Sequence, residues 1–290
     1  MQTQAQQDLT GSALNAQRFR MLEDIARELQ GEVIFPINFD IALRIRKLSE
    51  DPTLSLDRLA AAINLDPLIA VRLLRMANSA AYNPGGQEVR DLTAAIGRLG
   101  LKTVRSTAMA IAMRQLLRSR EMVDFMDLAD RLWEHTLHCA AAASVVARRL
   151  TRLNPDDALL AGLLHDLGAF YMLYRAAQYA ELRARPDSLR HLVIQWHEGI
   201  GVSLLGALGV DEQIIEAVRD HDQPRPLPAA PKTLAEVVHV ANLLAGGTFE
   251  PTGGAGGTGD DPYASLADTA YPALREEIDA LTERMRAAID

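Results

Sequence analysis

The sequence contains very little cysteine and few aromatic residues. Of its 290 residues only one is a cysteine, Cys139, and 5% are aromatic. A single cysteine excludes an internal disulfide framework and fits a reducing compartment. Because 48% of the residues are hydrophobic, the core must be built mainly from Leu, Ala, Val and Ile. A composition rich in Ala and Leu favours helices over strands.

Long apolar runs and an excess of basic residues are also missing. No stretch approaches the roughly 18 consecutive apolar residues of a membrane span, and the polar residues 1–8 do not resemble a secretory signal. The formal net charge of −8 argues against a generic nucleic-acid-binding protein, which usually has a basic excess. We therefore expect a cytoplasmic protein that contacts no membrane and no nucleic acid.

Hydrophobic residues recur with helical spacing along almost the whole chain. Residues 55–63, 66–77 and 91–100 each begin with a Ser or Asp that can cap the N-terminus of a short helix. Later helices are longer. We therefore predict an all-α fold, with an N-terminal lobe of short helices (about residues 31–120) followed by a helical bundle (about residues 121–246).

The two ends of the chain differ from this central part. Residues 1–30 are predicted to form a polar tail and an amphipathic helix, and residues 263–290 to form a C-terminal amphipathic helix. These helices are expected to dock on the rest of the chain or on a partner, and a homodimer is one such pairing. The glycine-rich residues 247–262 are predicted to be a linker, because no strand precedes them and no Lys-Ser/Thr follows, as a phosphate-binding loop requires.

The most informative segment is Leu163–Gly168, where His165 and Asp166 stand in the most apolar stretch of the chain. A helix that is apolar nearly all round is expected to be buried. A buried carboxylate is costly unless it is paired, hydrogen-bonded or bound to a metal ion. The sequence therefore requires that some other group compensates the charge of Asp166.

Helical spacing places further polar residues on inward-facing sides of other helices. The inward candidates are His135, His165, Asp166, His197, His221, Asp222 and Asn242. Imidazole and carboxylate groups together suit Fe, Mn or Zn. A hydrogen-bonded pair of His135 and Asp166 without metal would also satisfy both groups, and a lone buried histidine is usually hydrogen-bonded to a carbonyl. His138, His191 and His239 are interpreted as ordinary helix residues.

The order of these residues resembles that of the HD superfamily of metal-dependent phosphohydrolases, whose H…HD…D ligands hold metal ions that activate water against a phosphate ester. Other motifs resemble more closely the HDOD (HD-related output) domains of bacterial signalling proteins, over about residues 30–246. These motifs are Phe35-Pro36, Asp66-Pro67, Asn78-Ser79, Leu99-Gly100 and Leu163–Gly168. The resemblance implies an all-helical, HD-like bundle and a signalling or regulatory role.

The resemblance also bears on catalysis, because HDOD domains are generally regarded as lacking a complete catalytic set. This chain has Asn242 where the closing aspartate of the hydrolases is expected, and a neutral amide is a poor ligand for a divalent ion. The candidate metal ligands are His135, His165, Asp166, His197, His221 and Asn242. We expect a non-catalytic domain that acts through signalling proteins or a nucleotide second messenger; the alternative is an HD-type phosphohydrolase that acts on a phosphate ester or nucleotide.

Two other chemistries are considered. The two short helices between Leu59 and Met76, with Arg72 and Arg75 on the second, superficially suit a DNA-binding helix-turn-helix. The acidic net charge favours an ordinary helical hairpin instead. Cys139 lies in an Ala-rich stripe and is expected to be a buried, inert thiol rather than a nucleophile.

Overall fold

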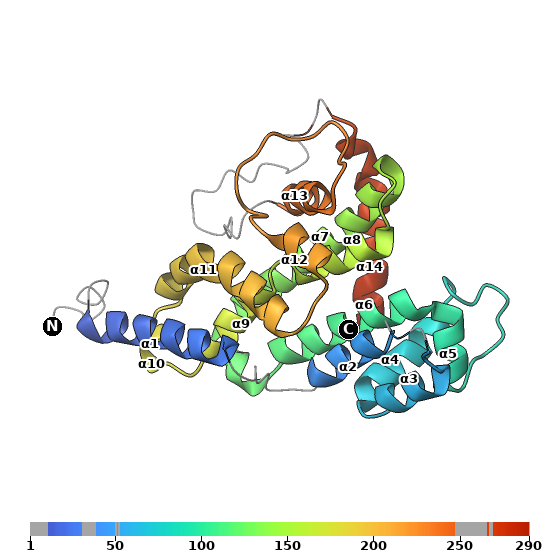
Figure 1. Ribbon diagram of the computed structural model, residues 1–290, viewed down its shortest axis with the longest axis horizontal. Helices are drawn as coiled ribbons and strands as arrows, with labels where there is room; N and C mark the ends of the chain where they lie inside the picture. Colours follow the sequence, from blue (N-terminus) through green and yellow to red (C-terminus); the bar gives the residue numbers. More distant parts are fainter. Residues whose placement is uncertain are drawn as a thin grey trace.

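The computed structural model describes residues 11–30, 39–49, 51, 53–246, 266 and 269–289. All regular secondary structure in these ranges is helical, which confirms the predicted all-α fold (Figure 1). In chain order the helices are α1 (Ser12–Leu29), α2 (Phe39–Ser49), α3 (Leu56–Ile63), α4 (Pro67–Ala77), α5 (Leu92–Leu99), α6 (Leu101–Leu117), η2 (Arg120–Phe125), α7 (Met126–Leu150), α8 (Pro155–Leu164), α9 (Leu167–Ala176), α10 (Ala180–Arg183), α11 (Pro186–Ala207), α12 (Glu212–Val218), α13 (Leu234–Leu244), η4 (Tyr271–Leu274) and α14 (Arg275–Ile289). None of these described helices has the length and hydrophobicity needed to cross a membrane.

The short helices α2 to α6 lie together at one end of the molecule (Figure 1). Their boundaries follow the capping residues of the sequence. Ser55 accepts a hydrogen bond from the backbone of α3, Asp66 accepts two from the first turn of α4, and Asp91 accepts one from α5. Gly100, with a φ of 80°, makes the sharp turn from α5 into α6.

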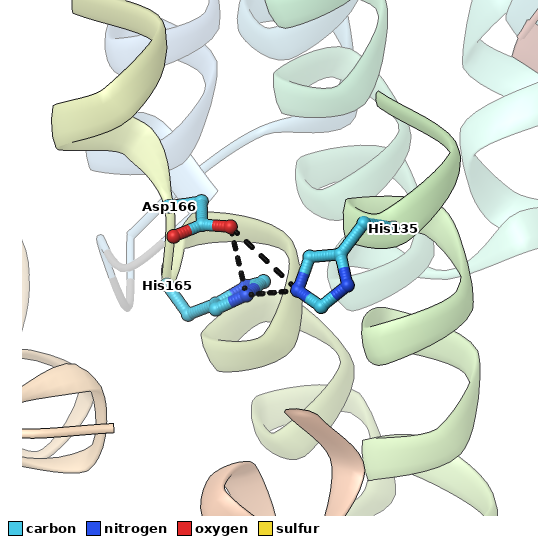
Figure 2. Close-up of side chains that lie close together, drawn as sticks. All are labelled: His135, His165 and Asp166. Carbon is cyan, nitrogen blue, oxygen red and sulfur yellow. Dashed lines mark hydrogen bonds and ion pairs between the residues drawn. The ribbon is translucent and has the colours of Figure 1, made fainter. Parts of the chain in front are cut away.

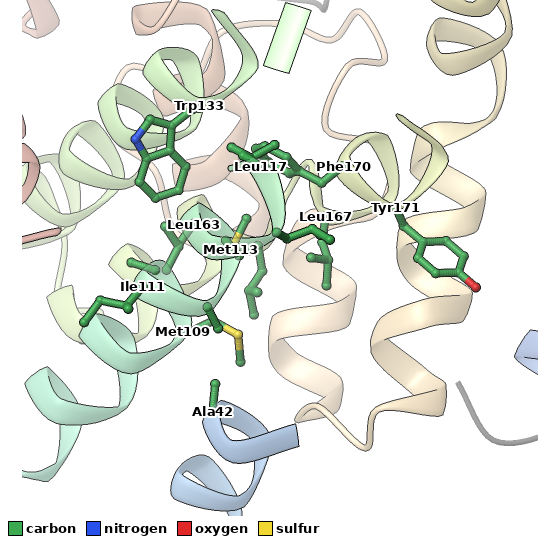
Figure 3. Packing of buried hydrophobic residues seen from close by; sticks show 14 of the residues in the cluster. Ala42, Met109, Ile111, Met113, Leu117, Trp133, Leu163, Leu167, Phe170 and Tyr171 are labelled. Atoms are coloured by element: carbon green, nitrogen blue, oxygen red, sulfur yellow. The ribbon is translucent and has the colours of Figure 1, made fainter. Parts of the chain in front are cut away.

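The long helix α7 is the central element of the second group of helices, where it packs against α8, α13 and α14. A continuous hydrophobic core joins this group to the short helices. Figure 3 shows Met109 and Met113 of α6 between Ala42 of α2 and the side chains of Leu167 and Phe170 of α9, all of them buried. The helix α6 therefore lies in the shared core of both groups.

The terminal helices both pack on the rest of the chain. In α1, Asp24 accepts a hydrogen bond from Tyr179 at 2.5 Å, and Glu28 forms an ion pair with Arg175 at 2.6 Å. In α14, Ile278 is buried in a core cluster with residues of α7, against which α14 packs. The predicted glycine-rich linker, residues 247–262, and the Phe35-Pro36 motif lie outside the described residues. Cys139 is buried on α7, as predicted.

Candidate metal centre

Four segments that are distant in the sequence bring the predicted histidines together. His135 lies on α7, His165 follows α8, His197 lies on α11 and His221 follows α12. Asp166 stands at the centre, and its side chain is only 3% exposed. Figure 2 shows the imidazoles of His135 and His165 directed toward the carboxylate of Asp166. Five of the six predicted ligands thus share one buried site.

His165 and Asp166 form the turn between two helices rather than the middle of a single buried helix. The helix α8 ends at Leu164 and α9 begins at Leu167. Asp166 has left the helical region, with φ of −101° and ψ of 15°. The predicted helix through this segment is therefore wrong in one respect: it breaks at the His-Asp pair. The break allows both adjacent side chains to point into the same site.

Gly168 allows α11, which carries His197, to lie close to α9. A Cβ atom on Gly168, at the start of α9, would lie 2.1 Å from the carbonyl oxygen of His197 and 2.6 Å from the amide nitrogen of Gly201. Both distances are shorter than a side chain tolerates, so only glycine allows α9 and α11 to come this close. This approach of the two backbones brings His197 next to Asp166.

Each imidazole at the site is oriented by a hydrogen bond from Nδ1 to a backbone carbonyl. The acceptors are Ala245 for His135 (3.2 Å), Gly162 for His165 (2.7 Å), Val193 for His197 (2.9 Å) and Val218 for His221 (2.9 Å). Because a carbonyl only accepts, Nδ1 must carry the proton, and in a neutral ring Nε2 then presents its lone pair. The carbonyl contacts expected of ordinary buried histidines therefore also select the tautomer that binds metals through Nε2.

The four Nε2 atoms divide between the two oxygens of Asp166. Oδ2 lies 3.2 Å from Nε2 of His165 and 3.7 Å from that of His135. Oδ1 lies 3.3 Å from Nε2 of His221 and 3.5 Å from that of His197. Within each pair of histidines the Nε2 atoms approach one another, at 3.1 Å for His135 and His165 and 3.4 Å for His197 and His221. Two lone pairs at such distances repel unless a proton or a metal ion lies between them.

The pKa values show that Asp166 is ionised and that a positive charge on His165 accompanies it. Burial lowers the pKa of His135 to about 4, and the charge of neighbouring His165 acts in the same direction. Burial also opposes the charge of His165, but the carboxylate of Asp166 outweighs it and raises the pKa of His165 well above its usual value. The pKa of Asp166 is lowered well below its usual value, because the charge of His165 overcomes the effect of burial. The site is therefore an ionised carboxylate among imidazoles, a group that a divalent cation satisfies.

Asp166 also has an oxygen without a conventional partner. Its Oδ1 atom is buried and accepts no hydrogen bond from any residue that the structure describes. Such an atom is costly in a protein interior. With Nε2 of His197 and His221 close by, this oxygen has the surroundings of a metal ligand. The residues present therefore fit a metal ion of the kind that imidazole and carboxylate prefer.

The remaining predicted ligand, Asn242 on α13, contacts a second carboxylate. Its Nδ2 atom donates a hydrogen bond to Oδ1 of Asp222 at 2.8 Å. The other oxygen of Asp222 lies 3.4 Å from Nε2 of His197. Burial would raise the pKa of Asp222, but the hydrogen bond with His197 overcomes it and lowers that pKa. Asp222 was absent from the predicted ligand set, although it directly follows His221 as a second His-Asp pair.

A third carboxylate, that of Glu198, lies behind this pair. Its Oε1 atom accepts a hydrogen bond from the backbone of Asp222 at 2.8 Å and lies 3.8 Å from Nδ1 of His221. His239, interpreted from the sequence as an ordinary helix residue, bonds to the carbonyl of His221 at 3.1 Å. No sequence pattern singled out Glu198, because a charged residue beside a histidine on a helix usually faces solvent.

Comparison with known proteins identifies one family. The family model of the HDOD domain matches residues 35–224. A curated but uncharacterized protein of Treponema pallidum is 25% identical over an alignment of 215 residues, which covers 69% of this chain and 40% of that protein. The chain therefore spans about two fifths of the length of this curated relative.

Solved structures share the fold. A candidate metal-dependent phosphohydrolase from Shewanella amazonensis is 24% identical, with a TM-score of 0.69 and coverage of 95% of this chain and 100% of that one. A candidate signal transduction protein from Marinobacter aquaeolei is 21% identical, with a TM-score of 0.54 and coverage of 94% and 64% respectively. At these identities the likeness concerns the arrangement of the helices.

Proposed function

The chain belongs to the HDOD domain family, and from this premise we propose that it is a regulatory signal-transduction domain built around a bound divalent metal ion, without hydrolytic activity. One observation carries the metal proposal: four Nε2 atoms converge on the two oxygens of the buried Asp166. Each of these imidazoles is held by its Nδ1 atom, so the arrangement is already set in the folded chain.

The donor set indicates which ions are expected. Nitrogen and oxygen ligands together suit Fe, Mn or Zn, whereas Mg and Ca prefer oxygen alone. The proposed ligands are His135, His165, Asp166, His197, His221 and Asp222, with Asn242 acting by holding Asp222. When bound, such an ion polarises an oxygen of a phosphate group or lowers the pKa of a water molecule.

The charge of the site supports the non-catalytic proposal. Asp166 and Asp222 bring two negative charges to the Nε2 side of the imidazoles, which balance one divalent ion. The third carboxylate, Glu198, faces Nδ1 of His221, the nitrogen that bonds to a backbone carbonyl. A two-metal mechanism of hydrolysis needs two divalent ions, whose positive charge Asp166 and Asp222 do not balance. Asn242 is neutral and adds no negative charge.

The alternative function is an HD-type phosphohydrolase. Asp222 supports it, because the carboxylate of Asp222 lies beside Nε2 of His197, whereas Asn242 contacts Asp222 instead.

Elemental analysis of protein purified without added metal tests the metal proposal. We expect about one equivalent of Fe, Mn or Zn in the wild-type chain and a loss of most of it in Asp166→Asn. A matched control is Asp156→Asn, which changes an exposed carboxylate at the start of α8 and should leave the metal content unchanged. Metal at background level in the wild type, or retained in Asp166→Asn, would contradict the proposal.

Turnover separates the regulatory proposal from the hydrolase. Chains loaded with Fe, Mn or Zn are assayed against phosphomonoesters and phosphodiesters, nucleotides included. We expect no metal-dependent hydrolysis. Metal-dependent turnover that Asp166→Ala abolishes would establish the hydrolase instead.

We propose signalling proteins as the partners of this domain and a cytoplasmic location. The exposed aromatic ring of Phe19 on α1, 70% accessible, supports contact with another protein through the terminal helices. The same helices offer a homodimer as one form of assembly. Sedimentation velocity of the wild type and Phe19→Ser measures this: a dimer that the substitution dissociates supports the pairing, whereas a monomer in both excludes it.

A further inference from the structure

We propose that the protein has a second binding site, separate from the metal centre, for a small phosphate-bearing molecule of the nucleotide class. The site is a cavity of 370 Å³ between α4, α6 and the last residues of α14. This volume lies within the range of ligand pockets. None of the described residues of the His/Asp cluster lines it, so the proposal goes beyond the proposed function and does not depend on a metal ion.

The charge of the cavity selects the ligand. Arg72 of α4 and Arg114 and Arg118 of α6 line it, and none of the described lining residues carries a carboxylate. Guanidinium groups bind phosphate oxygens through pairs of parallel hydrogen bonds. Three of them around one cavity suit the compact tetrahedral dianion of a phosphate better than a dicarboxylate, whose two charges lie on separate planar groups. In a chain with a net charge of −8, such a basic cavity is a local exception.

Asp130 of α7 contacts two of the three guanidinium groups. Arg114 is only 13% exposed, lies over the ring of Trp133 at 5.4 Å, and contacts Oδ1 of Asp130 at 3.1 Å. Arg118 reaches the same oxygen at 3.7 Å. A single carboxylate oxygen thus holds two positive charges close together. Because this order is already present, less freedom is lost when an anion binds.

The rest of the lining suits the remainder of a nucleotide. Leu68, Ile111 and Ile289 supply an apolar wall for a flat ring. Gln115 donates through Nε2 to Oδ2 of Asp66 at 3.2 Å.

The contact with Asp66 fixes the orientation of the Gln115 amide. A carboxylate only accepts hydrogen bonds, so the Gln115 atom that faces Asp66 is the amide nitrogen Nε2. The amide oxygen Oε1 is buried without a hydrogen-bond partner among the described residues. A donor group on a nucleobase or sugar would satisfy it.

The cavity also has a physical connection to the metal centre. Asp130 and Trp133 both lie on α7, five and two residues before His135. Figure 3 shows Trp133 of α7 and Ile111 of α6 in the same packed region. An anion that competes with Asp130 for the guanidinium groups therefore changes the contacts of the helix that carries His135.

Calorimetric titration tests the site, with guanosine 5′-monophosphate, inorganic phosphate and succinate as probes. We expect saturable binding of the nucleotide, weaker binding of phosphate and none of succinate. Arg72→Gln and Arg118→Gln should each weaken nucleotide binding by about tenfold or more, the effect of losing hydrogen bonds to a charged group. Arg90→Gln is the matched control, because its side chain is 84% exposed and pairs only with nearby Glu88 among the described residues.

Phosphate could also bind at a metal ion, so Asp166→Asn is titrated beside the wild type. If the nucleotide binds the wild type and Asp166→Asn equally, the site is not at the metal ion, which supports the cavity. Arg118 is 54% exposed, so its substitution should preserve the fold, which circular dichroism checks, and the metal content of this variant should equal that of the wild type. Three outcomes would each overturn the proposal. The first is nucleotide binding that is lost in Asp166→Asn but kept in both arginine variants. The others are succinate binding as strong as that of phosphate, and no saturable binding of any probe.

Discussion

The two groups of helices pack in different ways. Around the metal centre, α9 and α11 meet backbone to backbone, and a Cβ on Gly168 would lie 2.1 Å from a carbonyl oxygen of the facing helix. Among the short helices α2 to α6, contacts are made by large side chains such as Ile63, Ile69 and Leu73. Gly97 of α5 is exposed, so no other helix meets α5 at this position.

This difference teaches where the molecule is rigid. Backbone contact fixes the distance between two helices with no side chain to adjust, so the atoms of the His/Asp cluster are held to a narrow geometry. The short helices are separated by side chains that have alternative rotamers. The basic cavity lies at the edge of these short helices, where a ligand can change the packing at smaller cost.

The largest effect should come from closing the space at Gly168. Gly168→Ala places a methyl group where the backbone of α11 lies, and the two helices must separate. Overpacking an ordinary core position costs roughly 1–3 kcal/mol. Since this overlap is with backbone atoms, we expect a loss of about 5 kcal/mol, near the upper limit for a single substitution. Thermal unfolding followed by circular dichroism measures it.

A control for this prediction lies on the facing helix. A methyl group at Gly199 of α11 would have no atom within 4 Å, so Gly199→Ala should be neutral or stabilising by up to about 1 kcal/mol. If Gly168→Ala unfolds at the same temperature as Gly199→Ala, the backbone contact does not determine the geometry of the site.

Metal removal should have the next largest effect. A ligand that binds only the folded state, at a concentration on the order of 100 times its dissociation constant, stabilises it by about 3 kcal/mol. For a chain of this size we expect chelation with EDTA to lower the midpoint of thermal unfolding by roughly 5 °C. Differential scanning calorimetry with and without EDTA measures the shift.

The same scan on two variants localises the effect. Asp156→Asn should respond to EDTA as the wild type does, because Asp156 is an exposed residue at the start of α8. Asp166→Asn should show almost no response, since it has lost its central ligand. An equal response in Asp166→Asn would mean that the stabilising ion is bound elsewhere.

The sequence predicts the short helices well because their ends are marked locally. Asp66 and Asp91 cap helices that begin where the pattern places them, and Gly100 stands at the turn that follows α5. Capping depends on a few neighbouring residues. The break between α8 and α9 had no such signal, because Leu, Ala and Gly on both sides of His165 are compatible with an uninterrupted helix.

At the candidate site, the sequence predicts which residues are buried there more easily than it predicts which of them contact one another. Buried His and Asp residues stand out in an apolar sequence, so the pattern alone groups His135, His165 and Asp166. The contact between Asn242 and Asp222 depends on how α13 packs against the turn after α12. Such distant contacts follow from the tertiary fold, so the predicted ligand set left Asp222 out and took Asn242 as a ligand.

A smaller effect is expected from a loop of the short-helix group. Asn78, which follows α4, donates a hydrogen bond to the carbonyl of Val89 at 2.7 Å and accepts one from its amide at 2.8 Å. Asn78→Ala removes both bonds, and at about 1 kcal/mol each we expect a loss of roughly 2 kcal/mol. Urea unfolding measures it. Asn83→Ala, in the same loop and without a side-chain hydrogen bond among the described residues, should cost less than about 0.5 kcal/mol.

The smallest effect tests the short helices at the exposed position Gly97, in the interior of α5. With open space around it, Gly97→Ala should stabilise the chain by about 0.5–1 kcal/mol, because alanine loses less backbone entropy than glycine when a helix forms. Gly100→Ala should instead destabilise by roughly 1–2 kcal/mol, since its φ of 80° disfavours any side chain. Urea unfolding of both variants measures whether each substitution raises or lowers the free energy of unfolding. If Gly97→Ala is as damaging as Gly168→Ala, a methyl group at an exposed helix position costs as much as one at the contact between α9 and α11, and the contrast between the two positions fails.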